Sequence, residues 1–215
     1  MSEQPISSRP RRRASPEARR AQILEAALRC FSQKGYHEAT MDDLAREAGL
    51  SKGSLYWHFK SKAEVFAGLL AAYTLELFQA WEREADAFRA GGGAGGGAGG
   101  GGGSVIALLG RIGELSLEHI VGQAALLRAW AEFVVHREVQ DLFAEIYRVS
   151  RRELCTWIRR GIESGEIRDV EPESLAAALT AGMEGLLLQA LVDPEFEPVR
   201  HWRVSWDVFA RGIAA

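Results

Sequence analysis

The sequence predicts an all-α protein of about nine helices, with a three-helix N-terminal domain followed by a larger helical bundle. Three observations support this fold class. Apolar residues recur at the spacing of a helix through most of the chain. Serine, threonine and proline stand where helices would begin, and glycine where they would end. No segment alternates apolar and polar residues with the period of two that marks a strand.

The first helix is expected to begin at Ser15-Pro16, because serine caps a helix and proline suits its first position. Gly35 ends it. Residues 1–14 before it are polar and rich in arginine, and we expect them to be a disordered basic arm. The apolar face of the helix contains Ile23, Leu24, Ala27, Leu28 and Phe31.

Two short helices are expected next. Thr40 begins the first of them, with Asp43 three residues later completing a capping box, and Gly49 ends it. Ser51 begins the second, which runs to about Phe59. Two short helices joined by a tight turn that contains glycine are the pattern of a helix-turn-helix.

A long helix follows from Ser61 to Ala90, where Glu64 completes a second expected capping box. It would be about 40–45 Å long at the helical rise. Residues 91–103 contain only glycine and alanine, so we expect a flexible loop between two helices. This loop satisfies G-x-G-x-x-G, but no strand precedes it, so the match does not indicate a nucleotide site.

The remainder of the chain again carries helical spacing. Glycine or proline separates several of the segments, and Pro172 and Pro198 each precede one. The expected helices span residues 105–120, 124–135, 139–164 and 173–192, and a last one follows Pro198.

The charge is distributed unevenly along the chain. Residues 1–62 hold 12 Lys and Arg against 7 Asp and Glu, whereas residues 63–215 hold 14 against 22. A basic first third on an acidic remainder is typical of a protein that meets phosphates at one end only. The alternative is an ordinary basic tail, because four of the arginines lie between Arg9 and Arg13.

Compartment and cofactor signals are few. The start of the chain lacks the apolar stretch of a signal peptide, and no apolar run is long enough to span a membrane. The two cysteines suggest reduced thiols in a cytosol, so a cytoplasmic location is expected. The five histidines show no metal-ligand spacing, and we expect neither a metal nor another cofactor.

A helical wheel sorts the residues of the third helix. Leu55 and Phe59 share one side and are expected in the core, whereas Gly53, Trp57 and Lys60 lie opposite. The outward side is the one that a recognition helix places in the major groove of DNA. The candidate DNA contacts from residues 40–62 are Thr40, Ser51, Lys52, Gly53, Ser54, Tyr56, Trp57, His58, Lys60 and Lys62.

Two other classes of protein remain as alternatives. Residues 49–53 satisfy G-x-S-x-G, the nucleophile motif of α/β-hydrolases, but that motif needs a strand-to-helix turn. Because a helix precedes it here, Ser51 is better interpreted as a helix cap, and we expect no catalytic residues. The other alternative is a helical module that binds another protein without an effector.

The string ILEAALRCFSQKGYHEATMDDLAREAGLSKGSLYWHFKSKAEVF resembles the N-terminal domain of TetR-family transcriptional repressors over about residues 18–70. Residues 126–194, with LLRAWAEFV, GIESGEIRDVEPESLAAAL and GLLLQALVDP, resemble the C-terminal domain of a TetR subgroup that includes regulators of choline metabolism and of efflux. The resemblance implies a homodimer, a palindromic DNA operator and a small-molecule effector whose binding ends repression. It divides the chain into a DNA-binding domain of residues 15–62 and a ligand-binding and dimerisation domain of residues 63–215.

Polar and aromatic groups within the apolar helices are the candidate effector contacts, with core packing as the alternative for each. They are Trp130, Phe133, His136, Tyr147 and Gln189, with His119 and Glu184 as further candidates. The Gly-rich loop is either a neutral spacer or a gate over this pocket. The arm from Arg9 to Arg13 either enters a minor groove or is a free tail.

The last two helices are expected to form the dimer interface, with an internal core as the alternative. The helix before Asp193 is broadly apolar, with small residues at Ala181, Gly182 and Gly185. The final helix carries a stripe of large apolar groups at i, i+4, i+7 and i+11. Two such helices from each subunit would pack around a two-fold axis. The stripe is Trp202, Trp206, Phe209 and Ile213.

Overall fold

The computed structural model of the chain describes residues 15–90, 103–123, 127–128, 131 and 137–215. Within these ranges there are eight helices and no strand, apart from one isolated bridge between Ile167 and Ala214. The all-α prediction is therefore confirmed, with eight helices against about nine expected. The helices are α1 (Pro16–Lys34), α2 (Met41–Glu47), α3 (Lys52–His58), α4 (Lys62–Arg89), α5 (Val105–Val121), α7 (Arg137–Glu163), α8 (Pro172–Val192) and α9 (Pro198–Ile213). The helix expected over residues 124–135 lies mostly outside the described residues, as do the basic arm and nearly all of the Gly-rich loop.

Helix starts follow the predicted caps with one exception. The side chains of Ser15 and Ser51 accept hydrogen bonds from the amides three residues later, and Thr40 and Asp43 form the full capping box. At Ser61 only half of the expected box is present. The Glu64 carboxylate instead accepts from the amide of Lys60, at 2.6 Å, because that amide lies just outside the helix start and points toward the carboxylate.

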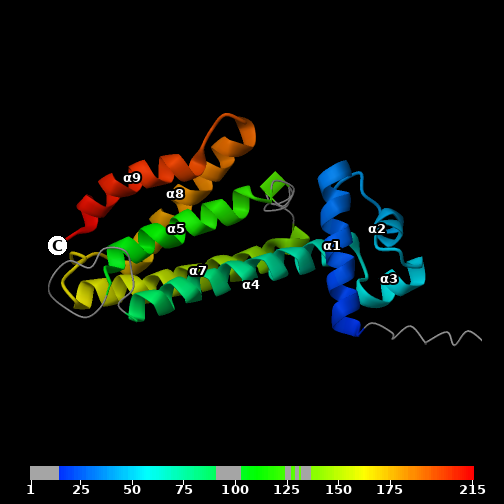
Figure 1. Cartoon of the computed structure of the whole chain (residues 1–215), viewed down its shortest axis with the longest axis horizontal. Coiled ribbons are helices and arrows are strands. Elements are labelled where there is room, and N and C mark those ends of the chain that lie inside the picture. Colours follow the sequence, from blue (N-terminus) through cyan, green and yellow to red (C-terminus); the bar gives the residue numbers. More distant parts are fainter. Residues whose placement is uncertain (1–14, 91–102, 124–126, 129–130, 132–136) are drawn as a thin grey trace, which may run out of the picture.

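The helices form two parts that α4 connects (Figure 1). We call α1–α3 the head and the remaining helices, from α4 onward, the body. In the body, α4 and α7 run along the long axis, and α5, α8 and α9 lie beside them, with the C-terminus far from the head. The head has its own apolar core, which extends past residue 62 into the first turns of α4 through Val65, Phe66, Leu69 and Leu70.

The contact between α5 and α9 depends on two glycines. A Cβ atom on Gly113 would lie 2.8 Å from Nε1 of Trp202, and one on Gly110 would lie 2.8 Å from Cε2 of Trp206. The indole of Trp202 donates to the carbonyl of Gly110 at 2.9 Å. Because Gly110 and Gly113 have no side chains, α9 can pack closely on α5 at these two positions.

This packing corrects part of the expected dimer stripe. Trp202 and Ile213 are buried within the chain, and Trp206 is half-buried against the same core. The alternative of an internal core therefore holds for these three residues, because the glycines of α5 provide space for both indoles. The large apolar residues that α9 exposes are Val204, Val208 and Phe209, and those that α8 exposes are Leu188 and Val192.

Helix α8 is the one described helix that is long and apolar enough to span a membrane, on length and composition alone. Its buried residues include Leu175, Leu179 and Leu187, which belong to the core of the body. A core helix with one exposed apolar side explains the same composition.

Candidate nucleic-acid interface and ligand cavity

The tertiary structure orients α3 as the helical wheel predicts. Leu55 and Phe59 are fully buried in the core of the head, whereas Trp57 is 68% exposed and Tyr56 37% exposed. Gly49 has a positive φ of 65°, which permits the tight turn between α2 and α3 because a Cβ would strain this conformation. The outer side of α3 is thus free of contacts with the head's core.

Most of the candidate DNA contacts lie on the surface of the head. Lys52 pairs with Asp42, at 2.8 Å, and the ammonium of Lys60 donates to the carbonyl of Tyr56 at 2.9 Å. The rings of Trp57 and His58 meet edge to face. The candidates that are exposed are Thr40, Ser51, Lys52, Gly53, Tyr56, Trp57 and Lys60, and those that are half-buried are Ser54, His58 and Lys62.

The side chain of Lys62, a candidate DNA contact, points into the protein. Its ammonium donates to three carbonyl oxygens in the turn between α1 and α2, those of Tyr36, His37 and Ala39. An ammonium has three N–H donors, so these bonds use all of them. Burial lowers the pKa of this amine. Lys62 therefore fastens the start of α4 to the head, and we omit it from the proposed DNA surface.

Thr40 also has an internal partner. It is a candidate DNA contact, but its backbone amide donates to the Asp43 carboxylate at 3.1 Å. Asp43 also pairs with Lys34, at 2.8 Å, and with Arg46, at 3.0 Å. Hydrogen bonds from Lys34 and Thr40 hold the pKa of Asp43 well below its usual range. The carboxylate of Asp43 therefore links α1 to the start of α2.

A cavity of about 140 Å³ lies in the body between α4, α5, α7 and α8. Its wall is mainly apolar and aromatic, and Glu184 is its one charged residue among those described. Most polar groups on it are hydroxyls, and those of Tyr73, Ser116 and Thr180 donate to backbone carbonyls of the chain, which leaves their oxygens as acceptors. The aromatic, hydroxyl and charged residues of the wall include Tyr73, Phe78, Trp81, Ser116, Phe143, Tyr147, Ser150, Thr180 and Glu184.

The predicted effector contacts agree with this cavity only in part. Tyr147 and Glu184 line it, whereas Gln189 is exposed on α8 and donates to the carbonyl of Gly185. Trp130, Phe133 and His136 lie outside the described residues. The aromatic residues of α4 that line this cavity, Tyr73, Phe78 and Trp81, were not among the candidates. Their helical spacing was visible, but it gave no way to distinguish a cavity wall from a filled core.

Two aromatic residues on the cavity wall are anchored by hydrogen bonds. The indole of Trp81 donates to the hydroxyl of Ser116 at 3.0 Å. The hydroxyl of Tyr73 donates to the carbonyl of His119, and the two rings stack with their centres 4.0 Å apart. Burial raises the pKa of Tyr73, so its hydroxyl stays neutral. His119, a further candidate from the sequence, is therefore a partner of Tyr73.

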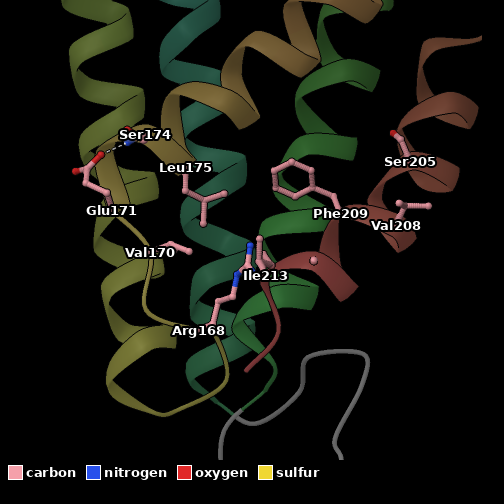
Figure 2. Close-up of a pocket in the computed structure, with 10 residues that line it drawn as sticks. Arg168, Val170, Glu171, Ser174, Leu175, Ser205, Val208, Phe209 and Ile213 are labelled. Atoms are coloured by element: carbon pink, nitrogen blue, oxygen red, sulfur yellow. Dashed lines mark hydrogen bonds between the residues drawn. The ribbon is translucent and has the colours of Figure 1, made fainter.

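A second hollow of about 810 Å³ lies where α8 and α9 diverge, and it is open to solvent (Figure 2). Leu175, Val208, Phe209 and Ile213 give it an apolar lining, with Arg168 and Glu171 nearby. The Glu171 carboxylate caps α8 by accepting from the amide of Ser174 at 2.6 Å, so this group is used inside the chain. Neither here nor elsewhere in the described ranges do three or more His, Cys, Asp or Glu gather as metal ligands.

Comparisons with known proteins cover both parts of the chain. Residues 23–69 match the family described as "Bacterial regulatory proteins, tetR family", and residues 121–210 match "BetI-type transcriptional repressor, C-terminal". The chain is 48% identical over 190 residues to the HTH-type transcriptional regulator TtgR of Pseudomonas putida, an alignment that covers 86% of each protein.

Two further matches differ in extent. The HTH-type transcriptional regulator SrpR of Pseudomonas putida is 44% identical over 66 residues, so the chain covers 31% of that protein and the match covers 30% of the chain. A putative transcriptional regulator from Saccharomonospora viridis, solved in complex with choline, has a TM-score of 0.72 and 25% identity. That alignment covers 94% of this chain and all of the other.

Proposed function

The chain belongs to the TetR family of bacterial transcriptional regulators, and from this premise we propose that it is a repressor that leaves its operator when a small molecule binds. The observation that carries the DNA-binding half of this proposal is the orientation of α3. Leu55 and Phe59 are buried, while Gly53, Trp57 and Lys60 face outward on a head that follows a basic arm. A helix with this division of faces can enter the major groove.

Specific residues of α3 suit different parts of a DNA duplex. Gly53 leaves open space on the outer side, so the helix backbone can approach base edges closely. Lys52 and Ser54 supply donors next to it. Tyr56, Trp57 and His58, with Lys60, suit contacts to phosphates and sugars, which position a protein without specifying sequence.

We propose that two copies associate through α8 and α9, which places two heads on the halves of a palindromic operator. The exposed apolar residues of these helices, which include Leu188 and Val208, have no cover within the described chain. Gly182 and Gly185 on α8 have open space where a Cβ would be, so a partner helix can approach closely. A face of this kind suits a two-fold interface. The hollow beside Phe209 continues the same surface.

The cavity in the body is the proposed effector site. Its aromatic wall and scattered hydroxyls suit a small, mostly apolar molecule, and Glu184 provides one position for a donor or a positive charge. A structural relative that was solved with choline supports a small-molecule ligand. Tyr147 remains a proposed contact, and Gln189 is omitted because of its exposed position.

We expect no enzymatic activity from the G-x-S-x-G match. The hydroxyl of Ser51 accepts a hydrogen bond from the amide of Ser54, at 3.2 Å, and residue 51 follows helix α2. A cap fits this geometry, whereas a strained nucleophile needs a preceding strand. A DNA-binding role also implies a cytoplasmic location.

Selection of bound duplexes from random DNA, followed by gel shifts, tests the proposal. We expect an enriched palindrome whose affinity falls steeply with salt, because binding releases counterions from phosphates. A small molecule that raises the melting temperature of the free protein should also release this DNA. Binding that ignores sequence would contradict the proposal and favour the alternative, a helical protein-interaction module.

A further inference from the structure

The core of the head contains one residue from far along the chain. Its buried members all come from residues 23–70 except Phe143, which lies near the start of α7 and is 4% exposed. Leu142 and Ile146 on the same helix pack against this core as well. In the described chain, α7 is therefore the body helix that, together with the first turns of α4, contributes to the apolar cluster of the head.

The same residue also lines the cavity. Phe143 shares the cavity wall with Ile146 and Tyr147 on α7 and with Leu70 and Tyr73 on α4. Each of these residues either belongs to the head core or packs against it. One wall of the proposed effector site is therefore the edge of the head core.

Phe143 differs from two other aromatic residues of this wall, because no hydrogen bond fixes its ring. Hydrogen bonds hold Trp81 to Ser116 and Tyr73 to His119. A phenyl ring has no donor or acceptor that could fix it in the same way. Phe143 is held by packing alone.

The small size of the cavity requires some part of its wall to move when a ligand binds. Its volume is about 140 Å³, whereas ligand sites usually have roughly 300–1,000 Å³. An effector of ordinary size must therefore displace part of the wall. Because protein interiors are close-packed, a displaced Phe143 cannot be absorbed locally and must shift its neighbours in the head.

Close contacts join the first turns of α4 to the head. Lys62 fastens α4 to the turn between α1 and α2. A Cβ on Gly68 would lie 3.1 Å from both Leu24 and Phe59, so α4 lies close against the head here. We therefore expect a displacement of Phe143 to act on the head as a whole, including α3.

We propose that Phe143 is the positioning residue that transmits occupancy of the cavity to the DNA-binding head. This role rests on the proposed function, and it assigns the transmission to a contact between α7 and the head. Phe143 lies between the cavity and the core of the head. When the cavity is empty, its ring keeps its position in that core. When a ligand fills the cavity, the ring is displaced toward the head.

A double-mutant cycle tests this role without a known effector. Thr180→Phe places a phenyl ring in the cavity from the α8 side and serves as a built-in occupant, and Phe143→Leu replaces the ring with a shorter side chain. We expect Thr180→Phe alone to weaken binding to the selected operator at least fivefold. In the Phe143→Leu background the same substitution should weaken binding less than twofold, because the shorter side chain yields. The readout is the coupling in operator affinity, compared with the coupling in melting temperature of the same four proteins, because two residues that line one cavity can also couple in stability.

Phe88→Leu is the matched control, because Phe88 is also 4% exposed but lies in the body core away from the cavity. In that background the fivefold effect should persist. Circular dichroism checks the folding of each variant, and Ser150→Met serves as the occupant if Thr180→Phe does not fold. An occupant without effect on operator binding, or an equal effect in both Phe143 backgrounds, would overturn the proposal. Failure of the wild-type protein to bind any specific operator would instead refute the proposed function.

Discussion

The Nζ atom of Lys62 lies 2.6 Å from the carbonyl oxygen of Tyr36 and 4.2 Å from the centre of the Tyr36 ring. One side chain from the start of α4 thus binds both the backbone and the ring of a residue in the turn after α1. Two further carbonyls, those of His37 and Ala39, share the same ammonium. This contact joins the first part of the body to the head.

Replacing Lys62 with methionine should destabilise the protein by about 1–3 kcal/mol, because the two partly buried carbonyls of Tyr36 and Ala39 and the exposed carbonyl of His37 lose a charged donor. Urea unfolding followed by circular dichroism measures this change. Lys60→Met is the control, because Lys60 is exposed and donates to only one carbonyl. An equal loss in both variants would show that the triple contact has no special role.

Lowering the pH should destabilise the folded head, because the Asp43 carboxylate becomes protonated. Hydrogen bonds from Lys34 and Thr40 hold the folded-state pKa of Asp43 below that of the unfolded chain, which is about 3.9. The ionised carboxylate therefore stabilises the fold above about pH 4, and this contribution disappears as the pH falls below that value. Hydrogen bonds from Glu173 and Ser174 likewise lower the pKa of Glu171, to about 2, so Glu171 adds to the same trend.

Melting temperatures between pH 7 and pH 3 test this expectation. Asp43→Asn should lower the melting temperature at pH 7 and reduce its dependence on pH below about pH 5. Asp207→Asn, at an exposed position of α9, should retain the wild-type pH dependence. If the Asp43 variant also retains the wild-type slope, the hydrogen bonds of Asp43 are not what stabilises the head at neutral pH.

Gly113→Ala should cost about 1–3 kcal/mol of stability, because the new methyl group would overlap the Trp202 indole and overpack the α5–α9 contact. Helix propensity alone predicts a gain from the same change. Gly212→Ala on α9 has open space around it, so it should cause no such loss. Thermal unfolding distinguishes the two, and a stabilised Gly113 variant would mean that α9 is not packed closely on α5.

The proposed dimer can be tested by measuring the molar mass of the protein in solution. Light scattering coupled to size exclusion should give twice the chain mass of 23.6 kDa for the wild type. Val208→Glu and Leu188→Glu should each shift it toward the monomer, because they place a charge on the exposed apolar face of α8 and α9. Leu75→Glu is the control, since Leu75 is 58% exposed on α4, outside this face. A dimer that persists in both interface variants would place the interface elsewhere.

The sequence predicted local features better than tertiary ones. Ser15, Thr40 and Ser51 were identified as caps because a cap depends on residues three positions away, and the faces of α3 followed from helical spacing alone. The internal role of Lys62 could not be predicted, because its partners lie in a distant turn and an exposed lysine has the same local pattern as a half-buried one. The exposed position of Gln189 could not be predicted for a related reason: α8 is apolar almost all round, so spacing does not identify its inner face.

The large aromatic residues illustrate the same limit. A stripe such as Trp202 and Trp206 fits a core or an interface equally well, and only the glycines of α5 decide for the core. The cavity wall has the same ambiguity, because Trp81 and Phe143 follow ordinary core spacing. What distinguishes Phe143 is that it belongs to two sites at once, which appears only when the chain is folded.

The affinity of Gly53→Val for the selected operator tests the central claim most directly. Gly53 has no neighbour within 4 Å of a Cβ position and an ordinary backbone conformation, so a valine should leave the head folded. If α3 lies in the major groove, the added side chain blocks close approach to the bases, and specific affinity should fall at least tenfold while the melting temperature changes little. A folded Gly53→Val protein that binds the operator as tightly as the wild type would contradict the assignment of α3 as the recognition helix.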